Sequence, residues 1–302
     1  MFTDKWQSPS ARMRQFLTKW AKVAQQATLY REAGPIFPRT CDSCPARFSG
    51  DPNDALYRCC DCFCPAVECA DCTLNSHRRN PFHRVDVWAP ERGFWDRIPL
   101  SQVTTATNRK VVIELGHPLG VPCPTAVGRP STRKMTIVHD HGINEYIVRF
   151  CGCDDSETQQ PVPEPIQLIR FGLWPGSWKR PESAYTISAL RDHQLLGLQA
   201  QMSTHDYVQY LRRTTDIVCP EDVPVRNFHD AATPRNHAYR AQDRYREFMT
   251  AAREFTFIRA TKHAGIEPSE DLEPGVLTIR CPACPQPGVN MDVSERRPAG
   301  EE

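Results

Sequence analysis

The sequence predicts an α+β protein in which a small zinc-binding module precedes a β-rich body with C-terminal helices. Three observations predict it. Most cysteines stand in close pairs near histidines, short runs rich in Val and Ile lie between residues 98 and 155, and segments with a helical apolar period lie on either side. Together they indicate a metal-stabilised fold with a sheet and several helices.

The composition bears on three properties: nucleic-acid binding, secretion and membrane insertion. The chain has 302 residues with 14 Cys, 10 His, 27 Pro and a formal net charge of +1, so whole-protein charge offers no argument for nucleic-acid binding. The N-terminus lacks the apolar core of a secretory signal, and no apolar run is long enough to span a membrane. We therefore expect no membrane contact and a reducing compartment, where thiols are free to bind metal.

The first predicted element is a helix over residues 9–33. Its apolar residues follow a 4, 3, 4, 3 spacing and form one stripe: Phe16, Trp20, Val23, Ala27 and Tyr30. Basic residues surround the stripe: Arg12, Arg14, Lys19, Lys22 and Arg31. We favour a helix that docks on the body or on a partner helix over one that faces DNA, because charge runs are usually solvated.

The β-rich region is predicted from runs at 111–115, 135–138 and 145–150, with a hairpin turn at His141-Gly142. A further strand is expected within 165–174. Helices are expected over 184–215, with a cap at Ser203-Thr204, and over 236–263, where Gly265 ends the helix.

Eight candidate zinc ligands lie between residues 41 and 83. They are three Cys-x2-Cys pairs and two histidines: Cys41 and Cys44, Cys59 and Cys62, Cys69 and Cys72, then His77 and His83. Zinc takes four tetrahedral thiolate or imidazole ligands, so eight candidates make two closed structural sites, paired either adjacently or in a cross-braced manner. Cys60 and Cys64 are left over, with Cys64 a rival to Cys62. A set of buried free thiols is the weaker alternative.

A second, long-range zinc site is predicted from four cysteines. Cys151 and Cys153 follow a predicted strand, and Cys281 and Cys284 lie about 130 residues later; together they offer a closed set of four thiolates. Two unrelated thiol pairs are the equally weighted alternative. His117 and Cys123 offer half of another site, although a core histidine and a buried cysteine are the favoured interpretation.

Two resemblances extend this interpretation. The ligand order of residues 41–83 resembles B-box and ZZ-type fingers. That resemblance implies the cross-braced pairing, with Cys41, Cys44, Cys69 and Cys72 on one ion and Cys59, Cys62, His77 and His83 on the other. We place this module at residues 36–90, after an N-terminal helix over 1–35.

The second resemblance rests on an ordered series of motifs: YRCCDCFCPAVECADCTLNSHRRNPFHRVDVW, ELGHPLGVPCP, GINEYIVRFCGC, LWPGSW, LRRTTD and CPACPQPGVN. Over residues 41–291 it resembles the cysteine-cluster (CxC-type) domain associated with KDZ (Kyakuja–Dileera–Zisupton) transposases. In that family an RNase H-like DDE catalytic domain follows the segment that corresponds to Cys281–Asn290, and this chain ends twelve residues after it. We therefore expect a body over 91–291, a disordered tail over 292–302, and no enzyme activity.

The resemblance implies a zinc-stabilised, non-catalytic module of a nuclear DNA transposase, with two zinc ions in the finger and a third in the body. Its expected partner is DNA, at transposon ends or at the target. The alternatives are a protein-interaction module that binds a transposase or another protein, and an N-terminal fragment of a full transposase. An independent nuclease is disfavoured because the carboxylates are scattered among loops rather than clustered for metal-ion catalysis.

Overall fold

The computed structural model describes residues 9–51, 55–117, 123–124, 131–155, 158–223, 237–268, 272 and 276–277. The chain divides into two compact units, residues 1–248 and residues 249–302. Within the described part of the chain, no helix combines the length and the apolar character needed to cross a membrane.

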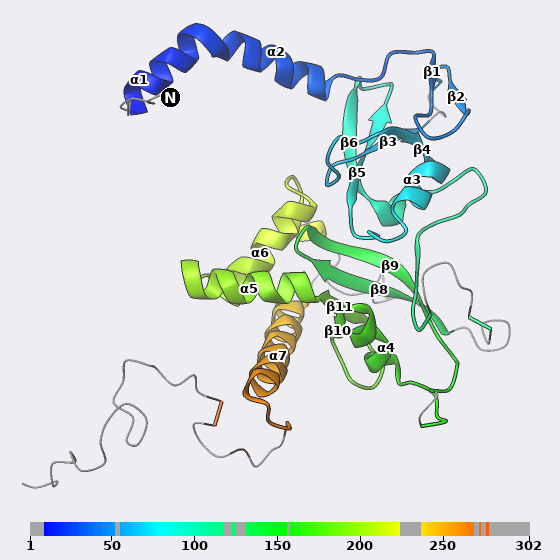
Figure 1. Cartoon of the computed structure of the whole chain (residues 1–302), viewed down its shortest axis with the longest axis vertical. Helices are drawn as coiled ribbons and strands as arrows, with labels where there is room; N and C mark the ends of the chain where they lie inside the picture. The colour runs from blue at the N-terminus through cyan, green and yellow to red at the C-terminus, as the bar shows by residue number, and fades with distance from the viewer. Residues whose placement is uncertain are drawn as a thin grey trace, which may run out of the picture. The chain divides into compact units, whose positions relative to one another are not determined.

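The N-terminal helix is confirmed. It consists of α1 (Pro9–Gln15), a π-helical turn (Phe16–Trp20) and α2 (Ala21–Glu32), shown in blue in Figure 1. Its apolar stripe is not buried: the exposed fraction is 59% for Trp20 and 87% for Tyr30. The expected docking of this stripe on the body is therefore not seen among the described residues.

The next segment, which we call the finger (residues 39–99), contains two small sheets. β1 (Arg39–Thr40) pairs with β2 (Arg47–Phe48) in a hairpin. A four-stranded antiparallel sheet has the order β4-β3-β5-β6, and α3 follows β4. Its elements are β3 (Leu56–Cys59), β4 (Val67–Cys69), α3 (Ala70–Ser76), β5 (Arg84–Ala89) and β6 (Phe94–Pro99). Because β6 pairs along the whole of β5, this sheet continues past the expected boundary at residue 90. A 3-10 turn (Leu100–Gln102) leads into the body.

The body is built on a five-stranded mixed sheet with the order β10-β11-β8-β9-β7. Its strands are β7 (Val112–Glu114), β8 (Ser131–His139), β9 (Gly142–Phe150), β10 (Leu173–Pro175) and β11 (Ser183–Thr186). β8 and β9 form the expected hairpin, with Asp140 and His141 in the turn. β7 runs parallel to β9, so these two strands end at the same edge of the sheet.

The strand expected within residues 165–174 is wrong for most of its length. Residues Glu164–Phe171 form the helix α4, and only Leu173–Pro175 form a strand. Pro165 is compatible with a first helical turn, and Pro165 and Leu168, three residues apart, are buried on one face of the helix. Gly172 then ends the helix with φ +96°, a conformation that glycine adopts without strain.

The C-terminal helical segments are confirmed. α5 (Ile187–Ala200) and α6 (Thr204–Thr215) cover the expected region except residues 184–186, which belong to β11, and a short 3-10 turn (Pro220–Asp222) follows. Ser203 caps α6 as expected, because its side chain accepts the N–H of Asp206. α7 (His237–Ala264) ends at Gly265, which has φ +68°. The sequence did not indicate β11, whose four residues are all buried.

Candidate metal centres

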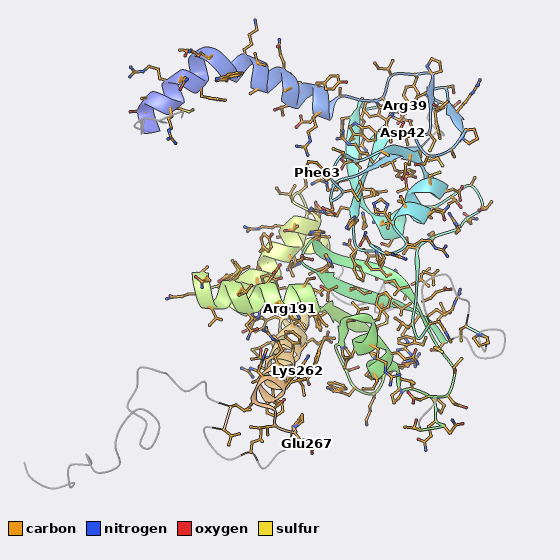
Figure 2. All side chains as sticks on the ribbon, in the orientation of Figure 1. Arg39, Asp42, Phe63, Arg191, Lys262 and Glu267 are labelled. Atoms are coloured by element: carbon orange, nitrogen blue, oxygen red, sulfur yellow. The ribbon has the colours of Figure 1, made fainter. Side chains whose placement is uncertain are left out.

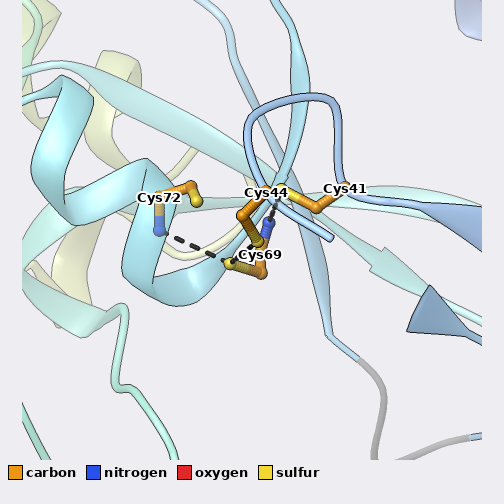
Figure 3. A group of neighbouring side chains, drawn as sticks. All are labelled: Cys41, Cys44, Cys69 and Cys72. Carbon is orange, nitrogen blue, oxygen red and sulfur yellow. Dashed lines mark hydrogen bonds between the residues drawn. The ribbon is translucent and has the colours of Figure 1, made fainter. Parts of the chain in front are cut away.

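The first candidate centre, which we call centre 1, gathers the thiols of Cys41, Cys44, Cys69 and Cys72 (Figure 3). Their sulfur atoms lie within 4.8 Å of one another, and the Cys44 and Cys69 sulfurs are 3.8 Å apart. A regular tetrahedron with zinc–sulfur bonds of about 2.3 Å has sulfur–sulfur edges of about 3.8 Å. The donor set therefore fits one closed tetrahedral zinc site.

Local hydrogen bonds hold centre 1 in place. The Cys41 sulfur accepts the N–H groups of Ser43 (3.5 Å) and Cys69 (3.3 Å), and the Cys69 sulfur accepts that of Cys72 (3.5 Å). Burial raises the pKa of Cys41, but the N–H groups of Cys69 and Ser43 bring that pKa below its ordinary value. These N–H groups favour the thiolate, the form that binds zinc.

The loop between Cys41 and Cys44 is also fastened to β4. The Asp42 carboxylate accepts the Val67 N–H at 2.8 Å, and the Asp42 N–H donates to the Val67 carbonyl at 3.1 Å. Arg39 donates to the same carboxylate at 2.8 Å, and both side chains are labelled in Figure 2. The first and third Cys-x2-Cys pairs are thereby brought together across 25 residues of chain.

Centre 2 gathers Cys59, Cys62, His77 and His83, whose ligand atoms also lie within 4.8 Å of one another. The His83 Nδ1 is 3.4 Å from both sulfurs, and the His77 Nε2 is 3.5 Å from the Cys62 sulfur. A tetrahedral zinc ion with one thiolate and one imidazole ligand spaces sulfur and nitrogen by about 3.5 Å. Centres 1 and 2 thus have the interleaved grouping of a cross-braced finger.

The histidine His77 is held in the tautomer that a metal requires. Its Nδ1 lies 2.9 Å from the Thr73 carbonyl, which has no hydrogen to donate, so Nδ1–H is the donor. The lone pair of Nε2 then faces the sulfur of Cys62. A hydrogen bond of this kind on the remote ring nitrogen is the usual support of a metal-bound histidine.

The two adjacent cysteines Cys59 and Cys60 have opposite environments. Burial raises the pKa of Cys59, but the neighbouring His77 imidazole and the Asp61 N–H more than offset this and lower the pKa. Burial and the Asp86 carboxylate raise the pKa of Cys60 to about 12. Cys60 donates to Asp86 at 3.0 Å and so remains a thiol outside the centres. Cys64, the expected rival of Cys62, is exposed and has no place in either donor set.

The side chain of Glu68 connects centres 1 and 2. This carboxylate is only 7% exposed and accepts hydrogen bonds from Ser43, which lies in the Cys41–Cys44 loop, and from Ser76, beside His77. A buried carboxylate is costly unless it is fully hydrogen-bonded, so Glu68 fixes both loops relative to β4.

Centre 3 lies in the body and gathers His117, Cys123, Cys151 and Cys153. The Cys123 sulfur lies 3.6 Å from each of the other two sulfurs. The His117 Nε2 is 3.1 Å from the Cys151 sulfur and 3.5 Å from that of Cys153. These spacings again suit a tetrahedral zinc ion with three thiolates and one imidazole.

The parallel pair β7 and β9 positions centre 3. His117 follows β7 and Cys151 follows β9, so both lie at the edge where these strands end. Gly116, with φ +85°, allows the close approach, because a Cβ atom there would lie 2.4 Å from the Cβ of Cys151. Only glycine combines a positive φ with the absence of a Cβ atom, so only glycine fits this position without displacing Cys151.

The donor set of centre 3 differs from the long-range set, which the sequence weighted equally with two unrelated thiol pairs. His117 and Cys123, which we expected to be a core histidine and a buried cysteine, complete the set around Cys151 and Cys153. Cys281 and Cys284 lie outside the described residues. The long-range set that includes these two cysteines therefore stays a prediction.

Each of the three donor sets can hold a metal ion in a closed, four-ligand structural site, and their sulfur-rich chemistry is consistent with zinc. Such a site stabilises the fold and offers no open position for a substrate. The sequence signal that could have identified centre 3 is the placement of a histidine and a cysteine just beyond the ends of two predicted strands.

Comparison with known proteins agrees with this cysteine-rich region. A family model described as a CxC2-like cysteine cluster associated with KDZ transposases matches residues 108–218. The resemblance expected from the sequence is thereby confirmed for this segment, which is shorter than the expected 41–291 and includes every ligand of centre 3. The matched family is an accessory cysteine cluster rather than a catalytic domain. No curated protein and no solved structure matched the chain.

Proposed function

We propose that this chain is a zinc-stabilised, non-catalytic module of a KDZ-type DNA transposase that helps to bind or target DNA in the nucleus. The observation that carries the proposal is that the family match contains the complete donor set of centre 3. A transposase-associated cysteine cluster and a preorganised four-ligand site thus coincide on the same segment.

In this proposal zinc holds the module together. The buried apolar residues of the finger form two small clusters, one of Cys41, Phe48 and Leu56 near centre 1 and one that includes Tyr57, Leu74 and Val85. A structural zinc ion contributes about 10–16 kcal/mol in zinc-finger peptides, far more than so small a core supplies. Metal binding and folding of the finger are therefore expected to be coupled.

Exposed cations support a role in DNA binding. The N-terminal helix presents five exposed basic side chains against one acidic residue, Glu32: Arg12, Arg14, Lys19, Lys22 and Arg31. α7 adds exposed Arg246, Arg253 and Lys262, although Glu247 and Glu254 reduce its charge. A helix with this charge excess attracts phosphates wherever it meets the duplex.

Fluorescence anisotropy with duplex DNA at increasing salt tests this function. We expect binding whose affinity falls steeply with salt, because each neutralised phosphate releases a counterion. Replacing Arg12, Arg14 and Lys19 with Gln should weaken binding and flatten the salt dependence. Lys134→Gln is the matched control, because Lys134 already pairs with Glu145 on the neighbouring strand. Failure of the intact, zinc-loaded chain to bind any duplex at low salt would refute DNA binding.

A second candidate function, protein interaction, is favoured by exposed aromatic side chains. Phe63 is 98% exposed at the loop between Cys62 and Cys64, and it is labelled in Figure 2. The apolar stripe of the N-terminal helix is exposed as well. Binding to a transposase polypeptide that Phe63→Ala or Trp20→Ala weakens, without any DNA binding, would favour this second function.

A third arrangement keeps the same module but places a DDE catalytic domain after it in a longer polypeptide. Sequencing of the transcript beyond the codon for residue 302 tests this arrangement. An in-frame acidic catalytic domain supports it, and an immediate stop codon opposes it.

A further inference from the structure

A fourth group of ligand atoms lies at the turn between β8 and β9, away from the cysteines. His139, Asp140 and His141 are half-buried, and their ligand atoms lie within 4.8 Å of one another. We propose that this turn is an open binding site for a divalent transition-metal ion such as Zn²⁺ or Co²⁺. Two imidazoles and a carboxylate are ligands that suit these ions, and three protein ligands leave a coordination position open.

The hydrogen bonding of His139 supports a cation here. Its Nδ1 accepts the backbone N–H of His141 at 3.1 Å, so the lone pair of this nitrogen points into the turn. The Asp140 carboxylate lies against the same nitrogen. One nitrogen cannot accept that N–H and also donate a hydrogen to the carboxylate. A cation held by the Asp140 carboxylate and by the Nδ1 lone pair would remove this conflict by taking the place of the N–H at that lone pair.

His141 adds a second observation. Its Nδ1 is buried and makes no well-aligned hydrogen bond among the described residues, and it pairs with the Asp61 carboxylate, 3.4 Å away, only when the ring is protonated. A buried ring nitrogen without a partner is costly, and a metal ion is one group that would satisfy it.

The turn is held rigid before any ion binds. The Thr215 hydroxyl accepts the Ile143 N–H at 2.7 Å. It packs so closely on Gly142 that a Cβ atom added there would lie only 2.5 Å from the hydroxyl oxygen. The Ser188 hydroxyl donates to the Asp140 carboxylate at 3.3 Å. Ligands that are already positioned lose little entropy on binding, which favours affinity.

The surrounding charge also attracts a cation. Asp61, Asp140 and Asp192 surround the turn, and the basic group that faces it, Arg84, already pairs with Asp61 at 2.7 Å. Burial and the nearby charge of Asp140 raise the pKa of Asp192, as expected where negative charges crowd together. A divalent cation would balance this excess.

The site has a structural consequence for the finger. Asp61 lies between the centre 2 ligands Cys59 and Cys62, and the Phe82 ring packs on His139 with ring centroids 5.1 Å apart. An ion at the turn would therefore strengthen the contact between the finger and the β8–β9 hairpin. This inference does not depend on the transposase assignment.

Titration of Co²⁺ into the full chain, dialysed beforehand so that only tightly bound zinc remains, tests the site. We expect one additional equivalent of Co²⁺ to bind, with visible ligand-field absorption and no thiolate-to-cobalt charge-transfer band, because the site has no sulfur ligand. Absence of the extra equivalent overturns the proposal. So does a thiolate charge-transfer band that accounts for all bound cobalt, since it would mark displacement of zinc from the cysteines.

Variants assign the signal to these residues. Asp140→Asn and His139→Ala should each weaken Co²⁺ binding at least about tenfold. His205→Ala is the matched control, because His205 also stands beside an aspartate, Asp206, with 3.6 Å between Nδ1 and Oδ1, but has no third ligand. Unchanged Co²⁺ affinity in Asp140→Asn overturns the assignment. That near-isosteric variant decides the question if His139→Ala does not fold, and retention of the tightly bound zinc reports folding.

Discussion

The side-chain amide of Gln167 brackets the backbone of Cys151. Its Oε1 accepts the Cys151 N–H at 2.8 Å, and its Nε2 donates to the Cys151 carbonyl at 2.9 Å. The same Nε2 also donates to the Val162 carbonyl at 2.8 Å, so both hydrogens of this amide, on a residue only 4% exposed, are hydrogen-bonded. Gln167 lies on α4, and it therefore fixes a candidate metal ligand from a helix that does not itself contribute one.

Gln167→Ala should loosen centre 3. Removing the amide takes the Gln167 partner from the half-buried Cys151 N–H and carbonyl, which costs about 1–3 kcal/mol. We expect weaker retention of one zinc ion against a chelator and a lower unfolding midpoint, measured on the full chain. Gln209→Ala, at a half-buried position on α6, is the control. Equal loss of zinc in both variants would contradict a specific role for Gln167.

Gly116→Ala should also disrupt centre 3, for a steric reason. The new Cβ would lie 2.4 Å from the Cβ of Cys151 and would push the two strand ends apart. Gly93→Ala controls for the positive φ, because Gly93 has φ +71° but no atom within 4 Å of the Cβ that the substitution would add. Elemental analysis should find one zinc ion lost from Gly116→Ala and none from Gly93→Ala. Full zinc content in Gly116→Ala would show that His117 does not need this close approach.

Glu68→Ala should weaken both finger centres together. The change removes the acceptor for Ser43, near centre 1, and for Ser76, near centre 2. We expect a loss of about 1–3 kcal/mol in the free energy of unfolding, with faster release of two zinc ions to a chelator. Glu91→Ala, exposed in the same part of the chain, should change neither quantity. Faster release of only one ion would show that Glu68 does not connect the centres.

Much of the finger could be predicted because its ligands come in local pairs. A Cys-x2-Cys pair brings two thiols together within one tight turn, and this local geometry holds whatever the rest of the fold. The choice between adjacent and cross-braced pairing was less local and relied on resemblance. It depends on β4 lying beside the Cys41–Cys44 loop, which Asp42 fastens to Val67.

The body was harder to predict because its important contacts are long-range. His117 meets Cys151 only because β7 runs parallel to β9, and no local pattern specifies that pairing. Residues 165–171 form a helix although a short apolar run is equally compatible with a strand. β11 is too short for periodicity to mark, and its place between β10 and β8 depends on the whole sheet.

Two cysteine variants distinguish the possible donor sets of centre 3. Cys123→Ser should remove one zinc ion, because a hydroxyl is a poor substitute for a thiolate on zinc. Cys281→Ser should remove none, since four other ligands complete the site. Cys60→Ser is a further control, because Cys60 donates to Asp86 outside every centre. Loss of zinc from Cys281→Ser with none from Cys123→Ser would restore the long-range set.

The most direct test of the account is the number of zinc ions bound to the full chain. Native mass spectrometry and elemental analysis should be carried out on protein purified without chelator and dialysed to remove loosely held ions. The three closed centres predict three tightly bound zinc ions per chain. Two ions would contradict centre 3, and a chain that folds without zinc would contradict the central claim that metal holds the module together.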